Sequence, residues 1–94
     1  MKLVKLKKTC SACPAQWEGK LEDGRMVYVR YRWGYLSVRV SENKTEDITD
    51  AVRGKEIFGV GVGDSMSGTL EFVELVGVTG HILDYSNVQE KRED

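Results

Sequence analysis

Residues 16–40 alternate between apolar and polar side chains with a period of two, and this pattern constrains the fold more than any other feature of the chain. Such alternation over this length is typical of β-strands whose two faces meet different surroundings. The aliphatic set is Val27, Val29, Tyr31, Leu36, Val38 and Val40, and the Arg/Tyr set is Tyr28, Arg30, Arg32, Tyr35, Ser37 and Arg39. We expect one side to face the core and the other to suit a flat or negatively charged ligand.

The pair Trp33-Gly34 divides this stretch into two strands and predicts a tight hairpin turn. Pairing around that turn places Val29 opposite Val38 and Arg30 opposite Ser37. A one-residue slip would mix the two faces, so the pattern itself fixes the register. A second hairpin, with its loop at 22–24, is expected to pair residues 15–21 with 25–32 and to bring Trp17 to the aliphatic face.

Shorter elements are predicted on both sides of this meander. Residues 2–8 alternate and favour an edge strand with Val4 and Leu6 directed inward. The run from Asn43 to Glu46 predicts a capping box that opens a short helix at 46–53. Residues 56–62 alternate again, and their glycines are expected to mark a strand face that packs close to another backbone.

The last third of the chain gives weaker patterns. Leu70, Val73 and Val76 share a helical face, which favours a helix over a strand for 69–76. Residues 81–83 are predicted as a final strand. We therefore predict a single mainly β (α+β) domain over residues 1–85, with a charged, solvated C-terminal tail at 86–94. Its architecture is expected to be an antiparallel β-meander sheet or a small barrel with one or two short helices.

The composition excludes some classes of function but does not identify one. The 94 residues include 14 basic and 15 acidic side chains, so no global field attracts nucleic acid. No apolar run approaches the roughly 20 residues of a membrane span, and the basic N-terminus lacks the apolar segment of a secretory signal. We expect a cytoplasmic protein with no membrane partner, in which cysteines are more often thiols or metal ligands than a disulfide.

The Arg/Tyr set is the main candidate for a ligand site. Arginine forms bidentate hydrogen bonds with phosphate and stacks on planar groups, and tyrosine adds a rigid ring and a hydroxyl. The alternative is structural, because cross-strand Tyr–Arg pairs stabilise a sheet by roughly 0.2–1 kcal/mol each. Trp33, at the hairpin tip, is predicted to be exposed and to act as an interface residue.

Two cysteines, Cys10 and Cys13, have the spacing of a zinc knuckle. A tetrahedral zinc site needs four ligands, so this chain supplies at most half of a cysteine-rich site. A redox pair, a zinc shared across an oligomer and two plain thiols all remain open. We expect no cofactor, with zinc at Cys10 and Cys13 as the alternative.

Catalysis is not indicated. The chain has one histidine, His81, and no second histidine or nucleophile is placed to work with it. A lone histidine in an apolar stretch is more often structural than catalytic. We expect a protein that binds and does not catalyse.

The segments at 10–19 (CSACPAQWEG), 23–25 (DGR) and 27–34 (VYVRYRWG) resemble a family of small bacteriophage and bacterial proteins. The resemblance covers most of residues 10–76 and implies a phage or host-bacterial setting, without an activity. By analogy of size and surface chemistry, small phage proteins with basic-aromatic pockets include anti-defence proteins, and some of these are oligomers that sequester nucleotide-type signals.

Three hypotheses for function follow. The first is sequestration of a phosphorylated, nucleotide-like small molecule, with Arg30, Arg32 and Arg39 on the phosphates and Tyr28 and Tyr35 on the planar part. Because so small a domain does not easily enclose a ligand, we expect that pocket at a homo-oligomer interface. The second is a protein–protein inhibitor or adaptor of a host defence protein that uses the same face. The third is single-stranded nucleic-acid binding, against which the near-neutral net charge counts.

Overall fold

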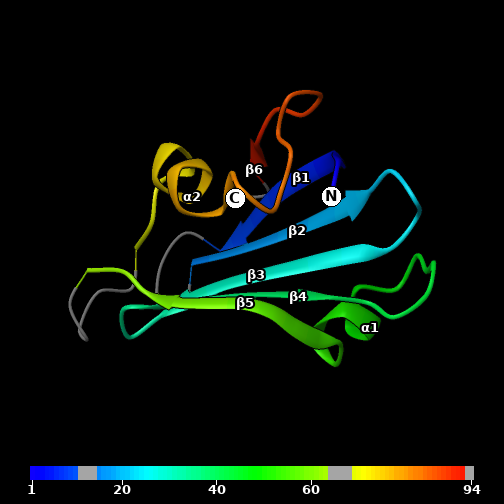
Figure 1. The fold of residues 1–94 in the computed structure, drawn as a ribbon, viewed down its shortest axis with the longest axis horizontal. Helices are drawn as coiled ribbons and strands as arrows, with labels where there is room; N and C mark the ends of the chain where they lie inside the picture. Colours follow the sequence, from blue (N-terminus) through cyan, green and yellow to red (C-terminus); the bar gives the residue numbers. More distant parts are fainter. Residues whose placement is uncertain (11–14, 64–68, 93–94) are drawn as a thin grey trace.

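The computed structural model describes residues 1–10, 15–63 and 69–92 and contains one open sheet with two short helices (Figure 1). The strand order is β5-β4-β3-β2-β1-β6. Strands β1 to β5 form an antiparallel meander, and β6 pairs with β1 in parallel. The strands are β1 (Leu3–Cys10), β2 (Ala15–Leu21), β3 (Met26–Arg32), β4 (Tyr35–Val40), β5 (Lys55–Gly61) and β6 (Lys91–Arg92), and the helices are α1 (Ile48–Val52) and α2 (Phe72–Thr79). The prediction of a mainly β meander with short helices is confirmed.

The register of the central hairpin is the one that the alternation predicts. Val29 pairs with Val38 and Arg30 with Ser37. Trp33 and Gly34 both have positive φ, at 55° and 73°, which defines the type I′ turn that suits the twist of a two-residue hairpin. Strand β2 also pairs with β3 as expected, so that Trp17 lies opposite Val29 on the apolar side.

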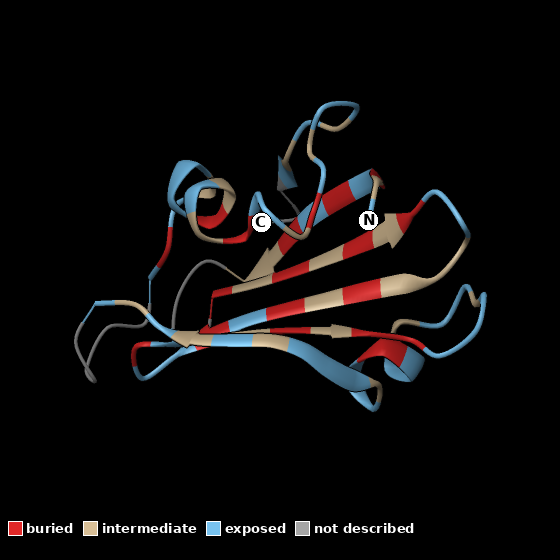
Figure 2. Ribbon diagram, viewed as in Figure 1, coloured by how far each residue is buried: buried red, intermediate tan, exposed pale blue. Residues whose placement is uncertain are grey.

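The core lies on one side of the sheet, between the strands and a cover made of α2 and the segment that follows it (Figure 1). Buried and less buried residues alternate along β2, β3 and β4, as the banding in Figure 2 shows. The buried apolar cluster comprises Leu3, Leu6, Ala15, Trp17, Leu21, Val27, Val29, Tyr31, Leu36, Val38, Val40, Leu70, Leu75 and Leu83. The aliphatic set defined from the sequence therefore forms the part of the core that the sheet contributes.

Helix α2 turns a different face to the core than its sequence predicts. Val73, expected to face inward, is 76% exposed, whereas Leu75 is fully buried. The helix begins at Phe72, with a capping box between Glu71 and Glu74. Leu75 and Thr79, one helical turn apart, are the two residues it buries, and this pair sets its orientation on the sheet.

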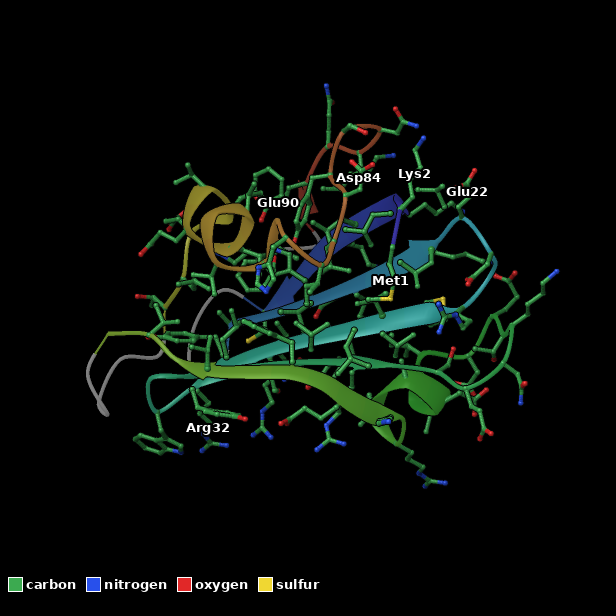
Figure 3. All side chains as sticks on the ribbon, viewed as in Figure 1. Met1, Lys2, Glu22, Arg32, Asp84 and Glu90 are labelled. Atoms are coloured by element: carbon green, nitrogen blue, oxygen red, sulfur yellow. The ribbon has the colours of Figure 1, made fainter. Side chains whose placement is uncertain are left out.

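Helix α1 is shorter than predicted and has a different cap. Its N-cap is Asp47, whose side chain accepts a hydrogen bond from the Thr49 N–H at 2.9 Å, so the capping box expected at 43–46 is wrong. Asp47 competes successfully because its carboxylate reaches the first free N–H groups of the helix. Figure 3 places α1 on the side of the sheet to which Arg32 points, away from α2.

Strand β1 contains a bulge that changes which of its residues face the core. The register shifts between Leu3 and Lys5, so Leu3 is buried and Val4, predicted to point inward, is 43% exposed. Beyond Leu6 the inward position falls on Lys8, which is 1% exposed. Its ammonium donates a hydrogen bond to the Leu70 carbonyl at 3.0 Å and lies 4.9 Å from the centre of the Trp17 ring. These contacts satisfy a buried charge that would otherwise be costly.

The C-terminal segment also differs from expectation. Residues 81–83 form a turn and not a strand, with the Leu83 N–H bonded to the Thr79 carbonyl at 2.9 Å. The stretch from residue 86, expected as a solvated tail, lies against the sheet as far as residue 92. Val88 packs on the core, and Glu90 accepts a hydrogen bond from the buried Trp17 indole at 2.7 Å. No helix in the described part of the chain is long and apolar enough to cross a membrane.

Candidate functional site

The side of the sheet opposite the core carries a set of mostly charged and aromatic side chains, which we call the polar face. The pairing registers place on this side every residue that alternates with the core. Its charged and polar members are Lys5, Lys7, Gln16, Glu18, Lys20, Tyr28, Arg30, Arg32, Tyr35, Ser37, Arg39 and Glu56. Six of these are basic and two acidic, although the whole chain has a net charge of −1. The strands of the polar face therefore carry an excess of positive charge.

The lysines of the polar face are the residues that the sequence prediction missed. Lys5 and Lys7 lie opposite Lys20 and Glu18, so β1 extends the Arg/Tyr surface by one strand. Alternation with the inward Leu6 already turns Lys5 and Lys7 outward, but the sequence pattern did not show that β1 pairs with β2. Lys20 forms an ion pair with Glu46, which precedes α1.

Arg30 occupies the centre of the polar face. It lies between Gln16 on β2 and Ser37 on β4, and its side chain is exposed. Within residues 1–10, 15–63 and 69–92, the Arg30 guanidinium forms no hydrogen bond or ion pair. An arginine in this state presents all its donors to a ligand.

The hydroxyl end of the Tyr35 ring lies over Gly59 of the neighbouring strand β5. A Cβ on Gly59 would lie 2.7 Å from Cζ of Tyr35 and 2.8 Å from Oε2 of Glu56, so the ring occupies the space that a side chain would need. The Tyr35 hydroxyl donates a hydrogen bond to Glu56 at 2.9 Å, and this bond raises the pKa of Tyr35. The glycine of β5 therefore accommodates an aromatic ring, where we expected a backbone. The ring remains 46% exposed and forms a fixed aromatic surface.

Arg39 and Tyr28 are less available to a ligand than Arg30. Arg39 donates a hydrogen bond to the Gly54 carbonyl at 2.9 Å and lies 3.8 Å from Glu56, so it ties the end of α1 to the sheet. Tyr28 is half-buried, and burial is the main reason why its pKa is raised. The structure places all six ligand candidates on one face but leaves Arg30 and Arg32 as its most available cations.

Trp33 is exposed at the hairpin tip, as predicted, with 59% of its surface accessible. A bulky residue with positive φ is an outlier, and such strain persists where surrounding contacts hold it. Here the Val62 N–H donates a hydrogen bond to the Gly34 carbonyl at 2.7 Å, and the Arg32 guanidinium lies 5.2 Å from the Trp33 ring centre. The tip thus holds a second exposed aromatic ring beside a cation.

The position of the helices decides whether the polar face is open. Helix α2 packs on the core side through Leu75, so it does not cover the arginines. Helix α1 contacts β3 and β4 and covers only the end of the face near Lys20 and Arg39. The end with Arg30, Arg32 and Tyr35 is clear of both helices.

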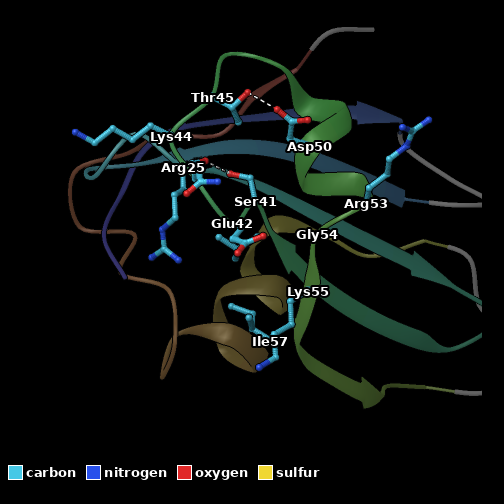
Figure 4. Close-up of a pocket in the computed structure, with 12 residues that line it drawn as sticks. Arg25, Ser41, Glu42, Lys44, Thr45, Asp50, Arg53, Gly54, Lys55 and Ile57 are labelled. Carbon is cyan, nitrogen blue, oxygen red and sulfur yellow. Dashed lines mark hydrogen bonds between the residues drawn. The ribbon is translucent and has the colours of Figure 1, made fainter.

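Three of the hollows in the described surface have no contribution from Arg30, Arg32, Tyr35 or Ser37. The first has a volume of about 690 Å³ and lies where β4 leads into α1 and α1 into β5 (Figure 4). Arg25, Lys44, Arg53 and Lys55 border it, together with Glu42 and Asp50. Figure 4 shows Lys44 and Arg53 directed away from each other, so these cations do not converge on one point. Arg30, Arg32, Tyr35 and Ser37 thus lie outside these three hollows, whereas Lys5, Lys7, Glu18 and Lys20 of the polar face line the second of them.

The cysteine motif is only half described. Cys10 ends β1 opposite Gln16, on the polar face, and is not in a disulfide. Cys13 lies outside the described residues, so zinc binding by Cys10 and Cys13 stays a prediction. Among the residues that are described, no three His, Cys, Asp or Glu side chains are grouped as metal ligands.

No protein-family model matches the chain, and comparison with curated proteins and with solved structures finds no similar protein.

Proposed function

We propose that this protein is a non-enzymatic binding protein whose polar face holds single-stranded nucleic acid. The observation that carries the proposal is the position of Arg30 and Arg32 on an open sheet surface beside the fixed ring of Tyr35. Arginines that lack an ion-pair partner can contact phosphates, and exposed aromatic rings can stack on bases of any sequence. An open sheet with aromatics and arginines is a recurrent platform for single strands.

A chain with nearly no net charge can still bind a polyanion through a local excess of positive charge on one face. Binding to a polyanion depends on the field at the contact surface, and here six basic side chains share one face with two acidic ones. The position of Arg30, Arg32 and Tyr35 outside these three hollows favours this hypothesis over capture of a free nucleotide. A small molecule needs a concave site to bury most of its surface, whereas a polymer can track across a flat face.

The test is fluorescence anisotropy with an oligothymidylate of about 20 nucleotides, longer than the roughly 4–16 nucleotides that small single-strand-binding folds cover. We expect binding that weakens steeply between about 50 and 200 mM salt. Arg30→Ala and Arg32→Ala should each weaken binding and lower the salt slope by about 1, with unchanged thermal stability.

Lys55→Ala is the matched control, because Lys55 is exposed and pairs with Val40, away from the polar face. It removes the same charge and should leave the affinity near that of the wild type. A duplex of equal length and a cyclic dinucleotide, used as competitors, separate the ligand classes. Displacement of the oligonucleotide by the cyclic dinucleotide alone, or no oligonucleotide binding at about 50 mM salt, would overturn the proposal.

A further inference from the structure

The two edges of the sheet differ in how they are protected. The β1 edge is covered, because β6 pairs with it and the Leu3 N–H donates to the Asp84 carbonyl at 3.1 Å. The β5 edge pairs with no strand in the described part of the chain. An uncovered edge exposes a row of unpaired backbone groups that can pair with another strand.

Two residues of β5 direct these backbone groups outward. The Val62 N–H bonds to the Gly34 carbonyl at the start of β4, so position 62 faces the sheet. Because backbone direction alternates along a strand, Gly61 and Gly59 turn their N–H and C=O groups to the free edge. The strand between Lys55 and Gly61 also lacks proline, which would block pairing there.

Along the same edge, the apolar residues of the described chain are less buried than in the rest of the core. Phe58, Val60 and Val62 pack against the buried cluster but are only half-buried. Leu36 and Val38, which lie opposite Val60 and Phe58 on β4, are fully buried. Apolar surface therefore remains exposed where the sheet ends, and covering it would be favourable.

We propose that a second copy of this chain pairs with the β5 edge, antiparallel and with a two-fold axis at Val60. In this register Gly59 lies opposite Gly61 of the second copy, and both are residues with outward-facing backbone groups, so each pair can exchange both hydrogen bonds. Phe58 lies opposite Val62 of the second copy, which joins the half-buried apolar residues across the axis. The edge is self-complementary in hydrogen bonding and in apolar contact, and this favours a second copy over an unrelated segment.

The consequence for the ligand site rests on the proposed function. Directly paired residues share a face, so the polar faces of the two copies become one continuous surface. The two Tyr35 rings, each lying over its own Gly59, then flank the axis. The two β4 strands are about 14 Å apart across the paired β5 strands, given the usual strand spacing of roughly 4.8 Å. One nucleic-acid strand can therefore contact the Arg32 and Tyr35 pair of both copies.

Sedimentation-velocity ultracentrifugation of the full chain tests the interface. We expect the wild type to have twice the 10.6 kDa chain mass. Gly61→Pro should return the mass to that of one chain, because proline removes the outward N–H while no bond to β4 is lost. Gly61→Ala is its control and should stay dimeric, since the nearest atom to an added Cβ is the Gly34 carbonyl oxygen at 3.9 Å. Ile57→Lys, at an exposed edge position, gives a second disruptive variant if proline perturbs the strand.

A wild-type protein that stays monomeric at about 100 μM, well above the Kd of a stable dimer, would overturn the interface. So would a dimer that neither Gly61→Pro nor Ile57→Lys dissociates. Oligothymidylate anisotropy on the same samples keeps the two proposals apart. A monomer that binds the oligonucleotide refutes only the interface, and a dimer that does not bind it refutes only the nucleic-acid function. If both proposals hold, Gly61→Pro should bind roughly 10²-fold more weakly, because the second contact is lost.

Discussion

The ring of Tyr35 lies across the backbone of Gly59, in the space that a Cβ would occupy. The missing side chain of Gly59 thus determines where the exposed aromatic ring of the polar face lies. The Glu56 carboxylate completes this arrangement by accepting the tyrosine hydroxyl at 2.9 Å.

Gly59→Ala should therefore displace the Tyr35 ring. The lost hydrogen bond costs about 0.5–1.5 kcal/mol, and the reduced freedom of the unfolded chain offsets about 0.4–1 kcal/mol of that. We expect the free energy of unfolding, measured in urea, to change little while oligonucleotide affinity falls to the level of Tyr35→Ala. Gly61→Ala, which has open space around its Cβ, should behave as the wild type. Equal affinity of Gly59→Ala and Gly61→Ala would show that the ring position does not matter for binding.

Tyr85 should make the fold sensitive to alkaline pH. Its hydroxyl lies 2.6 Å from the Thr79 hydroxyl, which itself donates to the Leu75 carbonyl, so Tyr85 is the donor to Thr79. Burial raises the pKa of Tyr85 from 10.0 to about 12. Above pH 10 the unfolded chain releases this proton while the folded chain retains it, so stability present below pH 10 is lost as the pH approaches 12.

Urea unfolding at several pH values across this range measures the effect. The wild type should lose on the order of 2 kcal/mol of stability, and Tyr85→Phe should show a correspondingly smaller loss over the same interval. Parallel pH profiles for the two proteins would contradict the assignment to Tyr85.

Glu90 should contribute to stability although it lies near the end of the chain. Its carboxylate accepts the indole N–H of Trp17, whose side chain is fully buried. Glu90→Ala leaves that donor without its partner, at an expected cost of about 1–3 kcal/mol in urea unfolding. Gln89→Ala, at the adjacent exposed position, is the control and should cost less than about 0.5 kcal/mol. If the two variants are equally stable, the C-terminal segment does not hold the core.

The central hairpin could be predicted from sequence because its information is local. Alternation from Val27 to Val40 and the Trp33-Gly34 turn together specify pairing, register and face, and neighbouring strands supply the partners. The same locality placed Arg30 and Arg32 together. The sequence did not predict which arginines are free to bind a ligand. That depends on distant residues such as Gly54 and Glu56, which the fold brings to Arg39.

The failures concern elements whose position depends on distant contacts. Helix α2 has apolar residues on several sides, and only the docking of Leu75 on the sheet selects one of them over Val73. The stretch from residue 86 has the composition of a solvated tail. Its contact with the sheet depends on the hydrogen bond between Glu90 and the buried indole of Trp17, which the composition does not reveal. Lys8 shares the inward side of β1 with Leu6, but its partners, the Leu70 carbonyl and the Trp17 ring, come from distant parts of the chain.

The excess of positive charge on the strands of the polar face gives the molecule an electrical direction. The polar face carries six basic and two acidic side chains, a net charge of +4, so the remainder of a chain with a net charge of −1 carries −5. A long-range field of this shape exerts a torque on an approaching molecule before contact and turns its cationic side toward an anionic partner. The isoelectric point of 5.8 is an average over these two regions and conceals both. A collision with a polyanion would thus begin with the polar face already leading.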